Sequence, residues 1–207
     1  MLEPILKKNL KLLFIGLNPA PKSCERGIYF SSNRRFWRLL KIAGLTDTEL
    51  VTGNSVHGDD RTLLRYEFGI TDLVHSAGQQ FEPALFNAGE RQRLEQEIKE
   101  SNPLTLCFIG KKAYKIYSGT VAEKYGWQDA IGKRKVFVMP FPTTTPVTDK
   151  LRLVVLSDLK FGLMHPKTGR QTCNCDEPTC GKCLGAGCWD IACKVHPVAA
   201  KYRRRFS

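Results

Sequence analysis

The chain has 207 residues, 42% of them hydrophobic, so it can bury the core of one domain with an appendage and is not disordered throughout. Lys and Arg number 32 against 20 Asp and Glu, and the formal net charge of +12 favours a polyanionic partner, although many basic proteins only carry a solvated basic face. No window approaches the roughly 18 apolar residues that span a bilayer, and the first ten residues lack a signal-peptide pattern. We therefore expect a cytoplasmic protein with no membrane partner.

Four short apolar runs predict β-strands that are covered on both faces. The first comprises residues 10–17 and stops at Asn18-Pro19. A residue before proline is driven away from the helical conformation, so Asn18 should be extended at the carboxyl end of this strand. The other three runs are residues 69–74, 104–110 and 136–140.

Helical patterns separate these runs. Within residues 34–44, four apolar side chains recur at the i, i+3, i+4 and i+7 spacing of one helix face, and Gly44 stops the pattern. These side chains are Phe36, Leu39, Leu40 and Ala43. Further helices are predicted at residues 90–101, 111–117 and 149–162, the last with an apolar face of Leu151, Val154, Val155 and Leu159.

The alternation of strands and helices predicts an α/β fold, a three-layer α/β/α sandwich with a mostly parallel four-stranded sheet. In such sheets ligands bind beyond the carboxyl ends of the strands, where Asn18 and the loop of residues 140–146 would both lie. Phe36 and Trp37 begin the apolar helix face and are expected in the core.

Four blocks carry a resemblance to a known family. They are GLNPAPKSCERGIYFSSNRRFWRLLKIAGL (16–45), LLRYEFGITDLV (63–74), LCFIGKKAYKIYS (106–118) and VFVMPFPTTTPV (136–147). The first block resembles the mismatch-specific uracil and thymine DNA glycosylases of the uracil-DNA glycosylase superfamily, whose first motif joins a strand, Gly-Ile-Asn-Pro-Gly, a Ser, a Gly, an aromatic residue and a helix containing Phe-Trp. The other blocks follow in the family's order, and that order is more specific than any single block.

The resemblance implies a monofunctional DNA glycosylase that flips uracil, including uracil mispaired with guanine, out of DNA and hydrolyses its N-glycosidic bond. It gives Asn18 the role of positioning the attacking water, and it gives Phe30 the role of stacking on the extruded base. Tyr29 takes the stacking role if the register shifts by one. Ser23 matches a family serine near the pocket, and Cys24 falls where the family commonly has Ala.

The second motif departs from the family. Its loop, Thr143, Thr144, Thr145 and Pro146, replaces the wedge that fills the space left by the flipped nucleotide, and these small side chains and their amides could hold phosphates. The arginine that some relatives insert into DNA is absent from the motif, so the preference for the opposite base is open. Ala20 also stands where the family usually has Gly.

Two alternatives stay open at this point. The first keeps the enzyme class and changes the base to hypoxanthine or thymine. The second is a non-catalytic DNA- or RNA-binding damage sensor, which the altered loop favours and the presence of Asn18 and Phe30 opposes. In each case the expected partner is nucleic acid, DNA with a damaged or mismatched base above all, bound by a monomer associated with the nucleoid.

Residues 165–207 differ in character from residues 1–164, which predicts a catalytic domain followed by a small basic module. Six of the eight Cys lie in this module, and in a reducing compartment such crowding favours a metal site, most simply zinc. An iron–sulfur cluster, disulfides and unliganded thiols are the alternatives. The candidate ligands are Cys173, Cys175, Cys180, Cys183, Cys188, Cys193 and His196. Arg203, Arg204 and Arg205 are candidate phosphate contacts, although a charged, disordered terminus is the competing interpretation.

Overall fold

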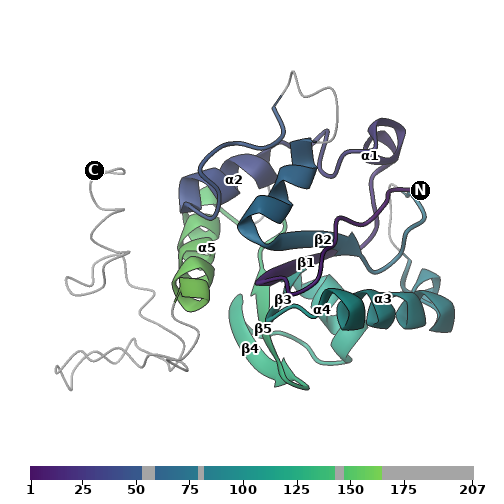
Figure 1. Cartoon of the computed structure of the whole chain (residues 1–207). Helices are drawn as coiled ribbons and strands as arrows, with labels where there is room; N and C mark the ends of the chain where they lie inside the picture. Colours follow the sequence, from purple (N-terminus) through teal and green to yellow (C-terminus); the bar gives the residue numbers. More distant parts are fainter. Residues whose placement is uncertain (53–58, 79–81, 143–146, 165–207) are drawn as a thin grey trace, which may run out of the picture.

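The computed structural model describes residues 1–52, 59–78, 82–142 and 147–164 (Figure 1). The predicted basic module, residues 165–207, lies outside the described residues, so the division of the chain at residue 164 stays a prediction. Within the described ranges, no helix is both long enough and apolar enough to cross a membrane.

The centre of the fold is a five-stranded sheet with the order β2-β1-β3-β5-β4. All four predicted strands are present and mutually parallel, which confirms the α/β class. Their bounds are β1, Leu12–Gly16; β2, Phe68–Asp72; β3, Thr105–Ile109; and β5, Arg134–Met139.

The predicted count of four strands is wrong, because a fifth strand, β4 (Gly126–Ile131), pairs antiparallel with β5 at the edge of the sheet. Its side chains after Gly126 are half-buried or exposed. An edge strand of this kind carries no continuous apolar run, which was the signal used for the other four.

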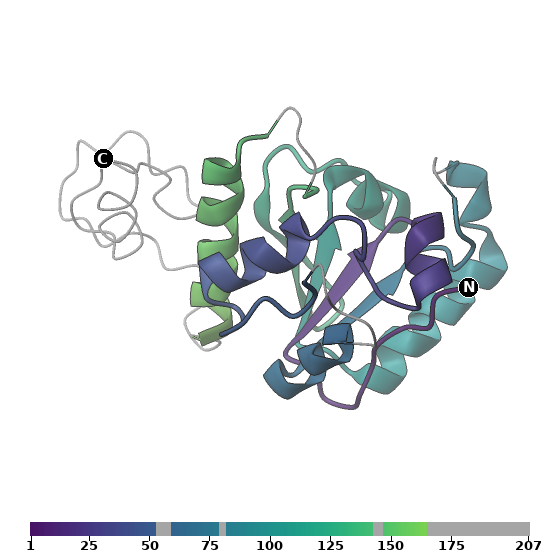
Figure 2. The same cartoon turned by 90° about the horizontal axis from the view of Figure 1, so that it is seen from above.

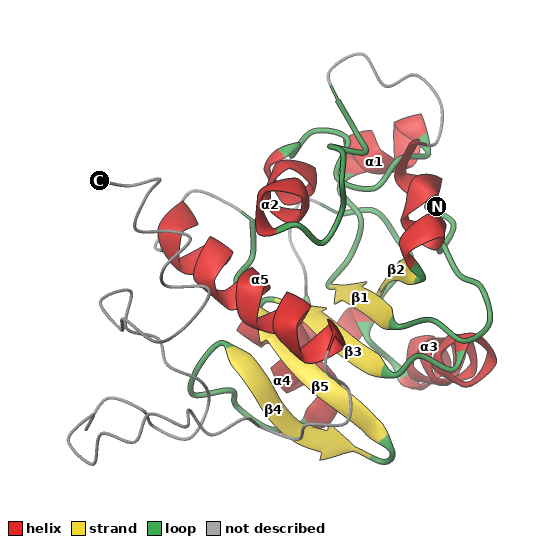
Figure 3. Ribbon diagram, turned by 60° about the vertical axis from the view of Figure 1, so that its left-hand side comes forward, coloured by secondary structure: helices red, strands yellow, loops and turns green. Residues whose placement is uncertain are grey.

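Helices cover both faces of the sheet and complete the three layers (Figure 3). One face packs against α2 (Arg35–Ala43), the 3-10 helix η1 (Asp59–Tyr66) and α5 (Asp149–Met164). The other packs against α3 (Ala88–Ser101) and α4 (Lys111–Ser118). The short helix α1 (Pro21–Arg26), like η1, had no counterpart among the predicted elements. Figure 2 shows α2 lying beside α5.

The predicted helix within residues 34–44 is confirmed as α2. Phe36 and Trp37 are fully buried, and Gly44 ends the helix in the left-handed conformation that glycine adopts without strain. The predicted apolar face of α5 is only partly right. Leu151 is 41% exposed, whereas Leu153 and Leu156, which the spacing did not select, are buried against the sheet.

The connections that follow β1 and β3 run over opposite faces of the sheet. The chain runs from β1 to β2 through α2, and from β3 to β5 through α4, which covers the other face. Adjacent strands with such divergent connections form a topological switch point, and ligands bind beyond their carboxyl ends. A ligand is therefore expected beside the residues that follow Gly16 and Ile109.

The outer edge of β2 is covered by the chain's own N-terminal residues. Ile5 and Ile70 exchange two backbone hydrogen bonds, of 2.9 and 3.0 Å, in an isolated antiparallel bridge. Both side chains are buried.

Candidate functional site at the carboxyl ends of the strands

Asn18 follows β1 at this switch point, as predicted, and is half-buried. Its side-chain nitrogen Nδ2 donates a 3.0 Å hydrogen bond to the carbonyl of Gly78, and the Gly78 N–H donates in turn to the carbonyl of Pro19. Because Nδ2 is committed to this contact, the amide orientation is fixed and Oδ1 is the atom left to accept a hydrogen bond. Such an oxygen can orient a water molecule.

The parallel pairing of β1 and β2 continues past the ends of both strands. Gly16 lies in register with Asp72, and the N–H groups of Leu73 and Val74 donate to the carbonyls of Gly16 and Leu17, at 3.0 and 3.1 Å. The backbone that leads to Asn18 is therefore held as a strand by β2.

The segment after Asn18 forms α1. Ala20, the departure from the family's Gly, precedes the helix with φ −69° and ψ 148°, an extended conformation that any residue adopts. The structure thus accommodates the Ala20 side chain without backbone strain. Of the predicted pocket residues on α1, Ser23 is buried and Cys24 is half-buried against the α2 side of the core.

Tyr29 and Phe30 differ in environment. Tyr29 is buried; its N–H donates to Oδ2 of Asp60 at 2.7 Å, and its carbonyl accepts from Nε1 of Trp37 at 3.0 Å. Phe30 is half-buried, and its ring stacks on Phe36 with centroids 4.3 Å apart and planes 22° apart. Of these two candidates, Phe30 is therefore the one with ring surface open to a base.

The backbone of Phe30 is unusual. Its φ of 51° is left-handed, a conformation that costs a bulky side chain free energy and that must be held by its surroundings. Asp60 and Trp37 fix the preceding residue, and Phe36 supports the ring. Strain of this kind clusters at functional sites.

Phe141 is a site residue that the sequence reasoning missed. It is 39% exposed, and its ring centroid lies 6.5 Å from that of Phe30. Its carbonyl accepts a 3.0 Å bond from Nε of the buried Arg152, and the next carbonyl, of Pro142, accepts from Asn33 at 3.0 Å. The backbone that leads into the Thr-rich loop is therefore firmly held, while the loop itself, Thr143 to Pro146, lies outside the described residues.

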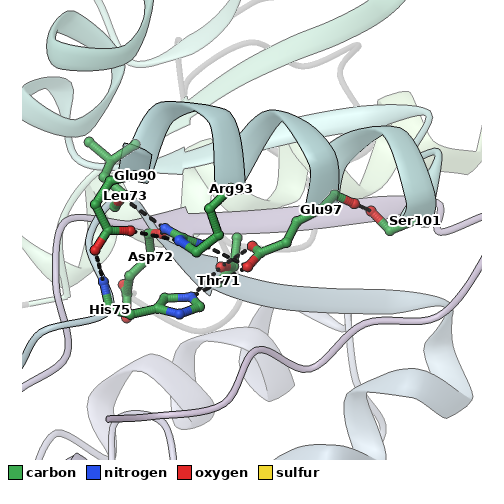
Figure 4. Close-up of polar contacts among 8 residues, drawn as sticks. All are labelled: Thr71, Asp72, Leu73, His75, Glu90, Arg93, Glu97 and Ser101. Carbon is green, nitrogen blue, oxygen red and sulfur yellow. Dashed lines mark hydrogen bonds and ion pairs between the residues drawn. The ribbon is translucent and has the colours of Figure 1, made fainter. Parts of the chain in front are cut away.

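Asp72 is a second residue that the sequence reasoning missed, and it lies in a polar cluster at the end of β2 (Figure 4). Arg93 of α3 donates to the carbonyls of Asp72 and Leu73, at 2.8 and 2.9 Å, and forms ion pairs of 2.6 Å with Glu90 and Glu97. The guanidinium thereby joins α3 to the end of the strand.

His75 extends this cluster into the segment that ends at Gly78. Its N–H donates to Glu90 at 3.4 Å, and its ring nitrogen Nε2 lies 3.5 Å from Glu97. Burial, and then the charge of Arg93, lowers the pKa of His75. Residues of α3 thus contact the chain at Asp72, Leu73 and His75, between the end of β2 and the Gly78 that contacts Asn18.

Burial shifts the pKa of two ionisable side chains, Asp72 and Tyr29. It raises the pKa of Asp72 to about 7, and the Arg93 guanidinium offsets part of that rise. Burial, followed by the charges of Asp72 and Glu97, raises the pKa of Tyr29 well above its usual value. The charge of Asp72 therefore acts on the Tyr29 hydroxyl.

The remaining predicted residues belong to the C-terminal module. Arg203 to Arg205 and the seven candidate metal ligands lie outside the described residues, so their roles stay predictions. In the ranges that the structure covers, no group of three His, Cys, Asp or Glu side chains could hold a metal ion. The two other Cys, Cys24 and Cys107, are free thiols.

A solution NMR structure of a candidate uracil DNA glycosylase from Methanosarcina acetivorans is similar, with a TM-score of 0.48 and 18% sequence identity, covering 77% of this chain and 96% of that one. The family model of the uracil DNA glycosylase superfamily matches residues 4–159, which contain every strand of the sheet and most of α5. The chain belongs to the uracil DNA glycosylase superfamily.

Proposed function

We propose that the protein is a monofunctional DNA glycosylase that excises uracil, including uracil mispaired with guanine, and leaves an abasic site. The observation that carries the proposal is the orientation of Asn18 at the carboxyl end of β1, with Nδ2 fixed on Gly78 and Oδ1 left as an acceptor. Membership of the superfamily, whose enzymes act on DNA, supports the same assignment.

The proposed reaction begins with extrusion of the nucleotide, because the glycosidic bond is inaccessible within the duplex. Phe30 offers a ring that is supported from behind by Phe36, and stacking on such a surface stabilises a flipped base by about 1–3 kcal/mol. The stacked base then presents its sugar carbon to the water that Asn18 orients.

Asn18 contributes by orientation and not by taking a proton, since an amide is a very weak base near neutral pH. Most of the reduction in the barrier must then come from stabilising the cationic sugar and the departing base anion. A slow enzyme is the expected consequence.

The test compares the full-length parent with Asn18→Ala and Asn18→Asp. Duplex oligonucleotides with uracil, thymine or hypoxanthine opposite each normal base are incubated with enzyme in excess, treated with alkali and sized. We expect uracil excision by the parent and at least a 100-fold slower rate for Asn18→Ala, with DNA affinity retained. Asn18→Asp keeps an acceptor oxygen but loses the donor that bonds the Gly78 carbonyl, so its activity should lie between those of Asn18→Ala and the parent.

The same assay separates the alternatives. Cleavage at hypoxanthine or thymine in preference to uracil would change the assigned base and keep the enzyme class. Tight binding without cleavage at any base would replace the enzyme by a damage sensor. Undiminished uracil release by Asn18→Ala would overturn the role of Asn18.

A further inference from the structure

Two buried polar groups that act on each other electrostatically, the Asp72 carboxyl and the Tyr29 hydroxyl, lack hydrogen-bond partners among the described residues. Asp72 is 6% exposed, and its carboxyl receives no hydrogen bond from the described part of the chain. The hydroxyl of Tyr29 is likewise buried without a partner there. Buried polar groups are nearly always paired, so unpaired ones call for a water molecule or a ligand.

The Asp72 carboxyl lies on the same face of the sheet as Asn18. Side chains alternate along a strand, so position 16 shares the face of Phe14, which contacts Phe36 and Phe68. Asp72, four residues after Phe68 on β2, shares that face too. Its Oδ1 occupies the space where a side chain at Gly16 would project.

Asn18 returns to this face two residues after Gly16, because the strand pairing continues through Leu17. Asn18 and Asp72 are then diagonal neighbours on paired strands. The strand spacing and rise put their Cα atoms at roughly 8 Å, a separation that two short side chains can bridge through one water molecule.

We propose that Asp72 is a catalytic carboxylate, which accepts a proton from the water that Asn18 orients. The inference rests on the proposed glycosylase function and deepens it, because it supplies the base that an amide cannot provide. The absence of a side chain at Gly16 leaves room for the carboxylate beside Asn18.

The step balances without a further reactant. The water oxygen forms a bond to the sugar carbon C1′, and the electron pair of the C1′–N bond leaves with the base as its anion. One water proton moves to the Asp72 carboxylate. That proton is later released to solvent or to the base anion, which regenerates the carboxylate.

The charges around Asp72 suit this role. Burial raises the pKa of its carboxyl to about 7, where a base is substantially ionised at neutral pH and still accepts protons well. The charged and titratable groups that act on it are Arg93 and Glu97 from α3 and Tyr29 from the loop after α1. Arg93 favours the ionised form, and Glu97 opposes it.

The principal test is the pH dependence of single-turnover uracil excision by the full chain. The parent rate should rise with pH and level off above about pH 7, as the carboxyl ionises. Asp72→Asn should lower the plateau by about 100-fold and abolish the rise, while DNA affinity changes less than threefold. Asp158→Asn is the matched control, because it removes another carboxyl whose pKa burial raises to about 7. Asp158 lies on α5 beside Trp127 of β4, at the opposite edge of the sheet from β2, so the profile should stay unchanged.

A second variant tests the assignment with Asp72 in place. Glu97→Gln removes the nearby negative charge that raises the pKa of Asp72, so the acid limb of the rate profile should move to lower pH. A limb that does not move in this folded variant, or one that persists in Asp72→Asn, overturns the role of Asp72 and leaves that of Asn18 standing. A parent that excises no base at any pH overturns the proposed function, and the role of Asp72 with it.

Discussion

Gly16 and Asp72 lie opposite each other on paired parallel strands, and the missing side chain at position 16 leaves the space that the Asp72 carboxyl fills. This relationship joins two sequence segments that are far apart in the chain. It also ties the first motif of the family resemblance to a strand end that the resemblance did not single out.

Gly16→Ala tests this relationship. The added Cβ would overlap Oδ1 of Asp72, so the carboxyl must move, and we expect a loss of about 1–3 kcal/mol in the free energy of unfolding. Urea unfolding at pH 7 measures it. In the double variant Gly16→Ala/Asp72→Ala the overlap is gone, so the two effects should differ from additivity by at least about 0.5 kcal/mol. Additive effects would show that the two positions are independent.

Phe30→Ala should weaken capture of the flipped base. Removal of the ring takes away the stacking surface that Phe36 supports, which is worth about 1–3 kcal/mol of affinity, or roughly 5- to 150-fold. Phe30→Leu keeps the apolar bulk without the flat face and should fall between parent and alanine. The measurement is the enzyme concentration that gives the half-maximal single-turnover rate. Identical curves for parent and Phe30→Ala would remove this residue from the site.

Asp158→Asn should change stability only above acidic pH. Burial raises the pKa of Asp158 to about 7, well above its ordinary value, so the folded chain retains a proton that the unfolded chain releases. This contribution to stability is fully present near pH 4 and is lost as pH rises toward 7. The amide carries no such charge, so the variant should match the parent near pH 4 and be more stable at pH 8, by on the order of 2–4 kcal/mol. Urea unfolding at both values checks it, and equal stability at pH 8 would contradict it.

The sequence predicted the fold well where burial on two faces produces continuous apolar runs. The residues of β1 and β3 are such runs, and both strands are where they were expected. β4 was not predicted, because its side chains after Gly126 are half-buried or exposed and its composition does not distinguish it from a loop.

The site was predicted only where local sequence carries the signal. Asn18 is marked by the proline that follows it, and Phe30 by the family motif. Asp72 has no local mark within Gly-Ile-Thr-Asp-Leu-Val, since its role depends on its register with Gly16, more than 50 positions earlier. Phe141 was predicted only as part of the loop of residues 140–146. Its position beside Phe30 depends on backbone contacts with Arg152 and Asn33, which are distant in the sequence and leave no local signal.

The bridge between Ile5 and Ile70 has a consequence for self-association. An edge strand with free N–H and C=O groups invites a strand of another molecule, and β2 forms one edge of this sheet. The N-terminal residues occupy the middle of that edge, so the strand that carries Asp72 is shielded from strand exchange between copies of the protein.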